Sequence, residues 1–596
     1  MAIRTGGVET RMAKQDKYER IIELAKRRGF FWPSYEIYGG TAGFINFGPL
    51  GAVMKHKLQD KWRDYFIRRQ GVLEIETPIF APRIVFEASG HVEHFREAMV
   101  QCTRCRGMFR ADHLLVERGG LSSSEAEKLS LDGLDAKLKE MGILCPECGG
   151  EFGKPTSFQT MFQTTIGPYS EAVGYGRPEA AQGMFTDFKR LYEVERGRLP
   201  MGVAQVGKAV RNEISPRQGP IRLREFTIME IEFFFDPTEP RCPRLGEVEE
   251  SKLRLILERD RLQGREEPIT VTVRQAVEQG LIKAEWMAYF MALAQAFVEE
   301  LGVPAERQRF IEKLPWERAH YSAQSFDQEV LLERWGWVEV SGHAYRTDYD
   351  LRRHMEFSGQ DMTVFRPFAQ PRKVKRLKLR PIAQVLGPAF KQNTPAVVEA
   401  LQKSDPEKVK ASFEENGFYE LPSGKVYPQQ VQILEEELEE AGERFIPHVV
   451  EPSFGAERLT YVAMEYAVKE KEDRLVIALP RDIAPTQAIV LPLVTRDGLP
   501  ERAQQLQRAL LDAGLTVAYD DAGSIGRRYV RADEMGVPLA VTIDYQTLTD
   551  NTVTLRDRDS WEQVRSPVNG LGEAIRRYCE GKASFAELGA PLKRSE

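Results

Sequence analysis

The stretch VRNEISPRQGPIRLREFTIMEIEFFFD, residues 210–236, decides how this chain folds. It predicts a strand, a turn and a second strand, because the Ser, Pro and Gly residues of SPRQGP are typical of a long hairpin loop. From Arg222 onward, the even-numbered residues of the second strand are mostly charged and the odd-numbered ones are mostly apolar. Alternate side chains of a strand point to opposite faces, so one face would be charged and the other mostly apolar.

The charged face of this predicted strand carries an uncommon set of groups. It holds two cations, an aromatic ring and two carboxylates, and the preceding strand repeats the pattern with Arg211 and Glu213. Such a face fits a ligand with phosphates, a flat base and an ammonium group; the alternative is a solvated sheet face with cross-strand ion pairs. The even positions of the second strand are Arg222, Arg224, Phe226, Ile228, Glu230 and Glu232.

Length and composition indicate a soluble protein with several domains. The chain has 596 residues, 42% of them hydrophobic and 29% charged, and no apolar run is long enough to span a bilayer. The polar N-terminus lacks the apolar core of a signal peptide. Six cysteines, four of them in two CxxC pairs, do not resemble a secreted disulfide framework, so we expect a cytoplasmic protein. The net charge of −6 requires any nucleic-acid site to be a local basic patch.

Hydrophobic spacing predicts the elements that flank this stretch. The expected elements are a helix at 17–29, a helix at 52–70, short strands around Leu73–Pro78, a polar insertion at 91–165, a helical region at about 246–302, strands at 336–351, an acidic helix at 429–445 and a strand running into a helix at 447–470.

Beyond a composition break near Lys469–Arg474 the chain alternates between strand and helix. The apolar runs LVIALP and AIVLPLV predict strands, and PERAQQLQRALLDAG predicts a helix that ends on glycine. This alternation is typical of a small α/β domain in which helices pack on a sheet.

Three motifs of the chain resemble those of class II aminoacyl-tRNA synthetases. VRNEISPR with RLREF resembles motif 2, EPSFGAERL resembles motif 3, and the helix at 52–70 running into ETPIF resembles motif 1, the dimer-forming element. YGRPEAAQG, GWVEVSGHAYRTDYDL and EPSFG together are similar to segments of the dimeric archaeal and eukaryotic-like glycyl-tRNA synthetases. The resemblance implies an α+β fold: a class II antiparallel sheet with flanking helices, a zinc-binding insertion and a C-terminal α/β anticodon-binding domain.

The resemblance also implies ATP-dependent attachment of glycine to tRNA(Gly) through a glycyl-adenylate, by a homodimer without a membrane. Arg211 would grip the α-phosphate, because a guanidinium fork pairs with phosphate oxygens and keeps its charge. Phe226 would stack under adenine, Glu213 would read its edge, and Arg458 would cap its other side or hold the γ-phosphate. The residues implied at ATP are Arg211, Asn212, Glu213, Arg222, Leu223, Arg224, Glu225, Phe226, Glu339, Val340, Gly455 and Arg458, with Arg211, Glu213 and Arg458 as the catalytic ones.

This reaction needs no nucleophilic side chain. Attack of a carboxylate on phosphorus depends mainly on positioning and on neutralising charge. Glu339 of GWVEV resembles the carboxylate that binds the Mg²⁺ between the ATP phosphates, and magnesium favours few carboxylates plus phosphate oxygens.

Selecting glycine is a special problem, because it has no side chain to grip and apolar pockets discriminate poorly against missing methylenes. Acidic groups crowded around the ammonium group and Cα would bind the ammonium group and exclude any substituent at Cβ. For each glutamate the alternative is an exposed surface carboxylate. The glycine-binding residues implied by the resemblance are Arg110, Glu179, Phe226, Glu230, Arg346, Glu451 and Ser453.

The four paired cysteines predict a structural zinc site. Cys102, Cys105, Cys145 and Cys148 make C-x2-C…C-x2-C, the ligand set of a closed tetrahedral site. The alternatives are residual cysteines of a lost site or a redox pair. Four protein ligands leave no open position, so a catalytic role is not expected. The segment 121–141 between the pairs would protrude as a helical loop.

Two regions are candidates for RNA contact. KVKRLKLR, residues 373–380, could bind phosphates, with a solvated charged strand as the alternative. In the C-terminal domain, reading of unpaired bases could use residues of one predicted helix. These candidates are Arg527, Arg528, Tyr529 and Arg531.

The sequence predicts six segments and leaves two rival functions. One rival is a non-catalytic, synthetase-like nucleic-acid-binding accessory subunit, against which the intact charged motifs argue; the other is a ligase for another small amino acid, such as alanine or serine. The segments are 1–90 with motif 1, 91–165 with the CxxC pairs, 166–365 with motif 2, 366–446 as a charged insertion, 447–472 with motif 3 and 473–596 as the anticodon-binding domain.

Overall fold

The computed structural model describes residues 16–592, apart from positions 123, 124, 127, 169, 170, 215, 217, 218 and 473. The polar N-terminus, three positions of the expected SPRQGP turn and one position of the composition break therefore lie outside the described residues. The chain forms two compact units, one made of residues 1–362 with 447–596 and the other of residues 363–446. None of the described helices has the length and apolar character of a membrane span.

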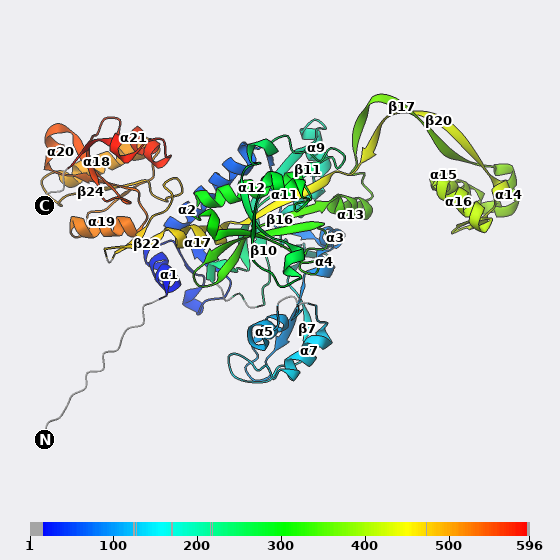
Figure 1. Ribbon diagram of the computed structural model, residues 1–596, viewed down its shortest axis with the longest axis horizontal. Coiled ribbons are helices and arrows are strands. Elements are labelled where there is room, and N and C mark those ends of the chain that lie inside the picture. Colours follow the sequence, from blue (N-terminus) through cyan, green and yellow to red (C-terminus); the bar gives the residue numbers. More distant parts are fainter. Residues whose placement is uncertain are drawn as a thin grey trace, which may run out of the picture. The chain divides into compact units, whose positions relative to one another are not determined.

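A nine-stranded, mostly antiparallel sheet forms the centre of the larger unit (Figure 1). Only the β12–β14 and β10–β3 pairs are parallel among its described strands. Across the sheet the order is β13 (Ile269–Thr272), β12 (Lys252–Ile256), β14 (Gln308–Glu312), β15 (Gln324–Leu332), β16 (Gly336–Thr347), β21 (His448–Gly455), β11 (Glu225–Phe235), β10 (Met201–Val210) and β3 (Leu73–Glu74).

Helices bury the apolar side chains of this sheet. α12 (Glu285–Glu300) packs on β16 and β21 and is apolar nearly all round, as expected of an interior helix. α17 (Ala456–Ala467) packs against α2 (Pro49–Arg63), which begins on a proline at its first position. α1 (Lys17–Arg28) is capped by the side chain of Asp16 and ends at Gly29, whose φ of 77° suits glycine. The two predicted N-terminal helices are thus confirmed.

The hairpin that decides the fold is present, with shorter strands than predicted. β10 ends at Val210 and β11 begins at Glu225, so Arg211, Glu213, Arg222 and Arg224 all lie in the connecting loop rather than on a strand face. The prediction of alternating faces holds only within β11, whose two faces are both buried.

The region expected to be helical at 246–302 also contains two strands. β12 buries Leu253 and Leu255 on one side, a period of two that the surrounding charges obscured, and it pairs with β13. Helical structure is confined to α10 (Glu258–Arg261), α11 (Val273–Glu278) and α12.

The insertion with the cysteines has a small core of its own. Its sheet contains β5 (Arg96–Gln101), β6 (Met108–Arg110) and β7 (Thr156–Gln159), next to α5 (Ala111–Gly119). α7 (Leu131–Glu140) does not protrude as predicted, because Leu134 and Leu138 pack in the same core as Cys102 and Cys145.

In the smaller unit, β17 (Val364–Pro381) and β20 (Val431–Phe445) run as a long two-stranded ribbon to a small helical end (Figure 1). The predicted acidic helix at 429–445 was wrong, since most of it is β20. Its glutamates face the cations of β17, whereas a helix would set them against one another. The helical end contains α14 (Ala383–Phe390), α15 (Thr394–Lys403) and α16 (Pro406–Asn416).

The C-terminal part of the larger unit confirms the predicted alternation. Its helices α18 (Leu499–Asp512), α19 (Ile525–Glu534) and α21 (Leu571–Cys579) accompany a six-stranded sheet with a separate apolar core. β23 (Arg474–Ile477) instead pairs with β22 (Val468–Lys471). The sheet order is β25 (Val517–Tyr519), β24 (Ala488–Pro492), β26 (Leu539–Ile543), β27 (Thr552–Asp557), β28 (Gln563–Pro567) and β29 (Ala590–Pro591).

Candidate active site

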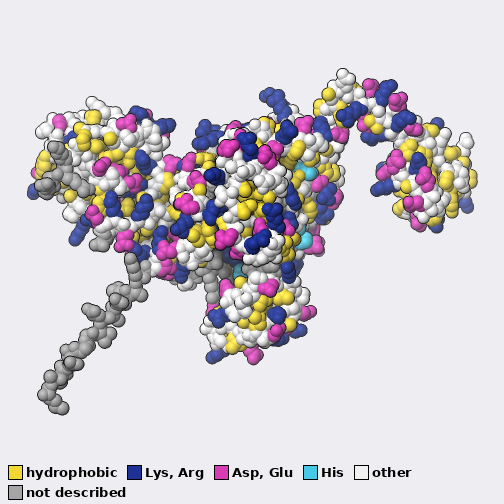
Figure 2. Space-filling model, in the orientation of Figure 1, with side chains coloured by type: hydrophobic (Ala, Val, Ile, Leu, Met, Phe, Trp, Pro, Cys, Tyr) yellow, Lys and Arg dark blue, Asp and Glu magenta, His cyan; other side chains and the backbone are white. Residues whose placement is uncertain are grey.

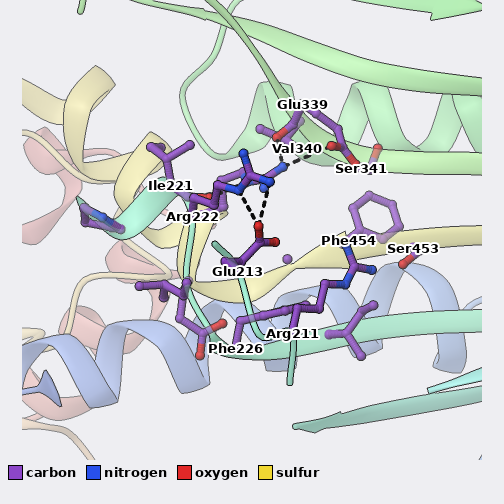
Figure 3. A pocket seen from close by; sticks show the side chains of 16 residues that line it. Arg211, Glu213, Ile221, Arg222, Phe226, Glu339, Val340, Ser341, Ser453 and Phe454 are labelled. Atoms are coloured by element: carbon purple, nitrogen blue, oxygen red, sulfur yellow. Dashed lines mark hydrogen bonds and ion pairs between the residues drawn. The ribbon is translucent and has the colours of Figure 1, made fainter. Parts of the chain in front are cut away.

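One pocket gathers most of the charged residues that the sequence singled out. Residues of β11, β16, β21 and the β10–β11 loop surround it (Figure 3), and it holds about 640 Å³, including space open to solvent. Its lining residues are Arg211, Glu213, Pro220, Ile221, Arg222, Leu223, Phe226, Ile228, Glu339, Val340, Ser341, Ser453, Phe454, Gly455, Glu457 and Arg458.

Arg211 and Phe226 place a cation near an aromatic ring in this pocket. The guanidinium carbon of Arg211 lies 5.3 Å from the centre of the Phe226 ring and 5.6 Å from that of Phe95. Its Nε donates to the backbone carbonyl of Pro178 at 3.1 Å. The pair suits a ligand that combines a flat base with anionic groups, because a guanidinium binds anions and an aromatic ring stacks on a base.

Arg222 and Glu213 form an ion pair across the loop. The Nε and Nη2 atoms of Arg222 lie 2.7 and 2.6 Å from Oε2 of Glu213 (Figure 3). Glu97, which comes from β5 of the insertion, approaches the same Nη2 to 3.7 Å. Burial raises the pKa of Glu97, and the Arg110 guanidinium opposes this. The insertion therefore places Glu97, a residue outside the sequence motifs, next to Arg222 of the pocket.

Arg458 and Glu339 close another side of the pocket. Arg458, in the first turn of α17, donates from Nε to the carbonyl of Ile221 at 3.0 Å, and its Nη1 lies 3.4 Å from the Glu339 carboxylate. Burial raises the pKa of Glu339, but the cations of Arg458, Lys313 and Arg211 more than offset this and hold it below its usual range. An ionised carboxylate facing the pocket is a suitable ligand for a divalent cation.

Three of the residues expected at ATP are not among the lining residues. Arg224 uses its guanidinium to bind the backbone carbonyls of Glu213 (2.9 Å) and Ala42 (2.7 Å), so it holds the loop and does not reach into the pocket. Glu225 pairs with Lys208 at 3.2 Å. Asn212 donates its backbone N–H to Thr160. The predicted alternation of strand faces was wrong for Arg224 because β11 begins only at Glu225.

A second group of charges surrounds Arg346 on β16, which is fully buried. Its guanidinium binds both oxygens of Asp350 at 2.8 and 2.9 Å, and Nη1 donates to Glu451 at 2.9 Å. Glu179 lies 3.4 Å away, and the Tyr321 ring lies 3.6 Å below the guanidinium carbon. Of these, Asp350 and Tyr321 were not anticipated; Asp350, in α13 (Tyr349–Ser358), is four residues after Arg346.

The carboxyl groups near Arg346 differ in their pKa values. For Glu179, His91 and Arg346 outweigh burial and hold the pKa well below its usual range. Burial raises the pKa of Glu230, whose Oε2 accepts from the backbone N–H of Ala180 at 2.7 Å, and raises that of Glu451 further. One guanidinium cannot keep every nearby carboxyl ionised.

The structure brings together most, but not all, of the residues expected at glycine. Glu230 pairs across strands with Ser453, and Glu179, Arg346 and Glu451 share the cluster above. Two residues lie elsewhere: Phe226 lines the pocket beside Arg211, and Arg110 pairs with Glu97 and Asp112 on the insertion.

The four cysteines converge into one cluster. Sγ of Cys102 lies 3.5 Å from that of Cys148, and Cys105 and Cys145 are 3.6 Å apart. Hydrogen bonds from the backbone, that of Cys105 first, lower the pKa of the Cys102 thiol, whereas the neighbouring thiols raise the pKa of Cys105, so the four thiols share their protons unequally. A Cβ on Gly150 would lie 2.7 Å from Cβ of Arg104 and 3.0 Å from Sγ of Cys102, so a side chain at this turn would displace its neighbours. The donor set fits a zinc ion.

The residues predicted to contact RNA differ in how far their side chains are engaged in contacts within the protein. Arg528 of α19 is buried and donates to backbone carbonyls of Asp521 and Gly523, so it supports the fold. Tyr529 hydrogen-bonds Thr542, and Arg531 pairs with Asp520. On the ribbon, cationic and anionic side chains are interspersed (Figure 2), and Lys375 and Lys378 already pair with glutamates of β20.

Comparisons with known proteins agree with this architecture. The C-terminal residues 487–578 match the family model described as an anticodon binding domain. The glycine–tRNA ligase of Aeropyrum pernix is 50% identical over 588 residues, which cover 97% of this chain and all of the relative. Those of Pyrococcus horikoshii and Methanocaldococcus jannaschii are 44% and 42% identical over 95% and 94% of this chain, and the matches cover 100% and 99% of those relatives.

A solved structure shares the fold at much lower sequence identity. The prolyl-tRNA synthetase from Cryptosporidium parvum, complexed with halofuginone and AMPPNP, matches with a TM-score of 0.50 and 13% identity. The match covers 95% of this chain and 76% of that one. It supports the class II synthetase fold.

Proposed function

We infer that this chain, which belongs to the glycine–tRNA ligase family, attaches glycine to tRNA(Gly) with ATP through a glycyl-adenylate. The single observation that carries this conclusion is the near-full-length identity of 50% to a glycine–tRNA ligase. The pocket at the end of β11 agrees with it, because cations, an aromatic ring and an ionised carboxylate lie together there.

We propose that ATP occupies this pocket. Phe226 stacks on adenine, Arg211 binds the α-phosphate, and Arg458 caps the nucleotide or holds the γ-phosphate. Arg211 neutralises the charge that grows on phosphorus as the glycine carboxylate attacks, which is the main catalytic requirement. Arg222 contacts Oε2 of Glu213 at 2.6 Å, and the other carboxylate oxygen of Glu213 would accept from the adenine edge.

Magnesium fits the same pocket. Glu339 is the carboxylate that would hold it, and the ion would supply charge neutralisation between the phosphates when bound. The chain's own residues position this carboxylate, since Arg458 and Lys313 keep it ionised.

We place glycine at the cluster around Arg346. Glu179, Glu230 and Glu451 would receive the ammonium, and Ser453 lies opposite Glu230 on the neighbouring strand. Arg346 holds two of these carboxylates in fixed positions at 2.9 and 3.4 Å. A rigid, fully buried wall of this kind leaves no room for a group at Cβ, which is how we expect alanine and serine to be rejected.

Zinc would be held by Cys102, Cys105, Cys145 and Cys148, and it would stabilise the fold of the insertion. Because the insertion carries Glu97 to the Arg222 side of the pocket, we expect its fold to matter for the loop that faces ATP. We further propose a cytoplasmic homodimer that uses the motif 1 helix α2, as expected from the sequence.

The C-terminal domain, from about residue 473, is proposed to bind tRNA. Removing residues 487–596 should spare glycine activation and weaken tRNA charging, because the chemistry-bearing residues all precede them and their apolar core is separate. A cut at 473 would also remove Ile477, Leu479 and Ile483, which pack in the core of the catalytic sheet. Pyrophosphate exchange and aminoacylation are measured side by side on the truncated chain. A folded truncated protein in which both activities fall together would make the domain part of the catalytic core.

The test of the function is ATP–pyrophosphate exchange with glycine, alanine and serine as separate substrates. We expect exchange with glycine at least about a hundredfold above the other two. Exchange with none of the three would favour a non-catalytic nucleic-acid-binding subunit, and equal exchange with alanine or serine would favour another ligase.

A further inference from the structure

Glu232 lies beside the Arg346 cluster, and the mechanism above does not use it. It follows Glu230 by two residues on β11, so both side chains point to the same face of the sheet. The residue is 0% exposed. Among the residues that the structure describes, neither of its carboxyl oxygens has a hydrogen-bond partner. A buried carboxyl without partners is costly as an anion, and its presence calls for a reason.

Three carboxyl groups meet at this point of the sheet. Oxygens of Glu230, Glu232 and Glu451 lie within 4.8 Å of one another. Glu230 accepts a hydrogen bond from the backbone of Ala180, and Glu451 accepts one from Arg346, so both have fixed partners. Glu232 is therefore the uncommitted member of the three.

The charged groups that face Glu232 come from four elements. They are Glu230 on its own strand, Glu451 on β21, Arg346 on β16 and Asp350 on α13. The short helix α8 (Ala181–Thr186) also packs on β11 and contains no ionisable residue, and β10 faces it with Val203. One cation thus faces several buried carboxyls, and burial together with Glu451 raises the pKa of Glu232 well above its usual range.

A metal ion is the other occupant that three carboxyls could suit. Arg346 already places a cation 2.9 Å from Glu451, and a second, divalent charge would be repelled by it. A proton, exchanged for the single charge of an ammonium group, fits the site better.

We propose that Glu232 is the charge-balancing residue of the amino-acid site: it holds a proton in the absence of amino acid and releases it when an ammonium group enters beside Glu230 and Glu451. In this step the O–H bond of the Glu232 carboxyl breaks, the proton passes to a buffer molecule, and the new carboxylate balances the ammonium charge. The charge of the Glu232 carboxyl and the ammonium group taken together is zero, as is that of the protonated carboxyl alone, and the negative charge of the glycine carboxylate is left for Arg211 and the ATP pocket. This inference rests on the proposed function, because it takes glycine to bind at this cluster.

The proton release can be measured by titrating the full-length protein with glycine in a calorimeter, in phosphate and in Tris at the same pH. The two buffers differ in ionisation enthalpy, so the difference in heat counts the protons. We expect wild type to release close to one proton per glycine and Glu232→Gln to release less than half as much. Glu436→Gln, the same change on the exposed ribbon, should release as many protons as wild type.

The pH dependence of glycine activation provides a second readout. At a pH below the raised pKa of Glu232, the free site is protonated and glycine competes with that proton. KM for glycine should therefore fall about tenfold for each unit by which the pH is raised, until the pH reaches this pKa. In Glu232→Gln this dependence should be lost, and KM for glycine should rise about tenfold at high pH. KM for ATP should not follow the same profile, whereas a merely structural defect would affect both substrates.

The outcomes separate this inference from the function on which it rests. Absence of glycine-dependent exchange in wild type would overturn the proposed function. Normal exchange with no proton release in wild type, or with equal release in Glu232→Gln, would overturn the inference alone. Should Glu232→Gln not fold, the wild-type proton count and pH profile decide.

Discussion

Arginines contact carboxylates at hydrogen-bonding distance in two regions, the cluster around Arg346 and the ribbon of β17 and β20. The two regions differ in how far these side chains are buried. Arg346 is fully buried and contacts three carboxylates, whereas Arg376 of the ribbon is 63% exposed and pairs with Glu440 at 2.5 Å. In sequence, the ribbon is the more conspicuous, because its charges are consecutive. The comparison teaches that charge density along a chain is a poor guide to the energy of an ion pair.

The physical reason is the solvent around each pair. An exposed pair is screened by water and salt and contributes about 0–1 kcal/mol. A buried cation that has lost its water holds its carboxylates strongly, and removing one partner leaves uncompensated charge. The following predictions test this difference, beginning with the largest expected effect.

Arg346→Met should lower the free energy of unfolding by about 3–5 kcal/mol and abolish glycine activation, because Glu179, Asp350 and Glu451 lose their shared cation. Urea unfolding followed by tryptophan fluorescence measures the first effect, and pyrophosphate exchange measures the second. The matched control is Arg376→Met on the ribbon, which should lose less than about 1 kcal/mol. Equal losses in the two variants would break the comparison.

Arg211→Ala should reduce adenylate formation by several hundredfold while leaving the protein folded. Its guanidinium is proposed to act at the transition state, and removal of one such contact costs roughly 3–4 kcal/mol. Exchange rates with saturating glycine and ATP provide the measurement, and the thermal unfolding midpoint checks the fold. A wild-type rate in this variant would refute the assignment of Arg211 to the α-phosphate.

Cys145→Ser should remove the metal and destabilise the insertion. Metal analysis of the purified wild-type protein is expected to find one zinc per chain, since the four thiols converge. The substitution should weaken tRNA charging more than adenylate formation, because no described residue of the insertion lines the pocket and Glu97 affects it only through a contact of 3.7 Å with Arg222. Cys242→Ser is the control, as this cysteine is absent from the cluster. A wild-type protein prepared without chelator, yet free of metal, would contradict the prediction.

The smallest effect is expected on the ribbon. A double-mutant cycle with Arg376→Ala and Glu440→Ala should give a coupling free energy below about 1 kcal/mol, which falls further at high salt. Aminoacylation by Arg376→Ala reports whether this part of the ribbon contacts tRNA. A coupling above about 2 kcal/mol would show that exposure does not set the energy of these pairs.

Much of the fold was predictable from local pattern. The helix that ends at Gly29, the strand-to-helix passage at Gly455 and the C-terminal alternation follow from periodicity and from residues that begin or end elements. Two predicted helical regions, 246–302 and 429–445, contain strands, and in both a run of charged residues concealed the strand. Leu253 and Leu255 of β12 lie among many charges, and the glutamates of β20 are explained as a strand only by the cations of β17 opposite them.

The sites divide in the same way. Motif resemblance identified Arg211, Phe226, Glu339 and Arg458, and the structure gathers them in one pocket. It could not show that Arg224 binds backbone carbonyls, because that depends on where β11 begins. Nor could it identify Glu97, which comes from a segment distant in sequence and lies 3.7 Å from Arg222 at the edge of the pocket.

The sequence by itself determined the family, the order of most elements and the chemical types present at the active site, because motif residues and hydrophobic periods are local properties. The tertiary structure alone decided which charges are buried, which share a partner and which face water. These properties depend on pairing between segments far apart in the chain, as when β11, β16 and β21 bring Glu232, Arg346 and Glu451 together. Since burial sets both the pKa of a carboxyl group and the strength of an ion pair, the pKa and the partners of each carboxyl group were decided only by the fold.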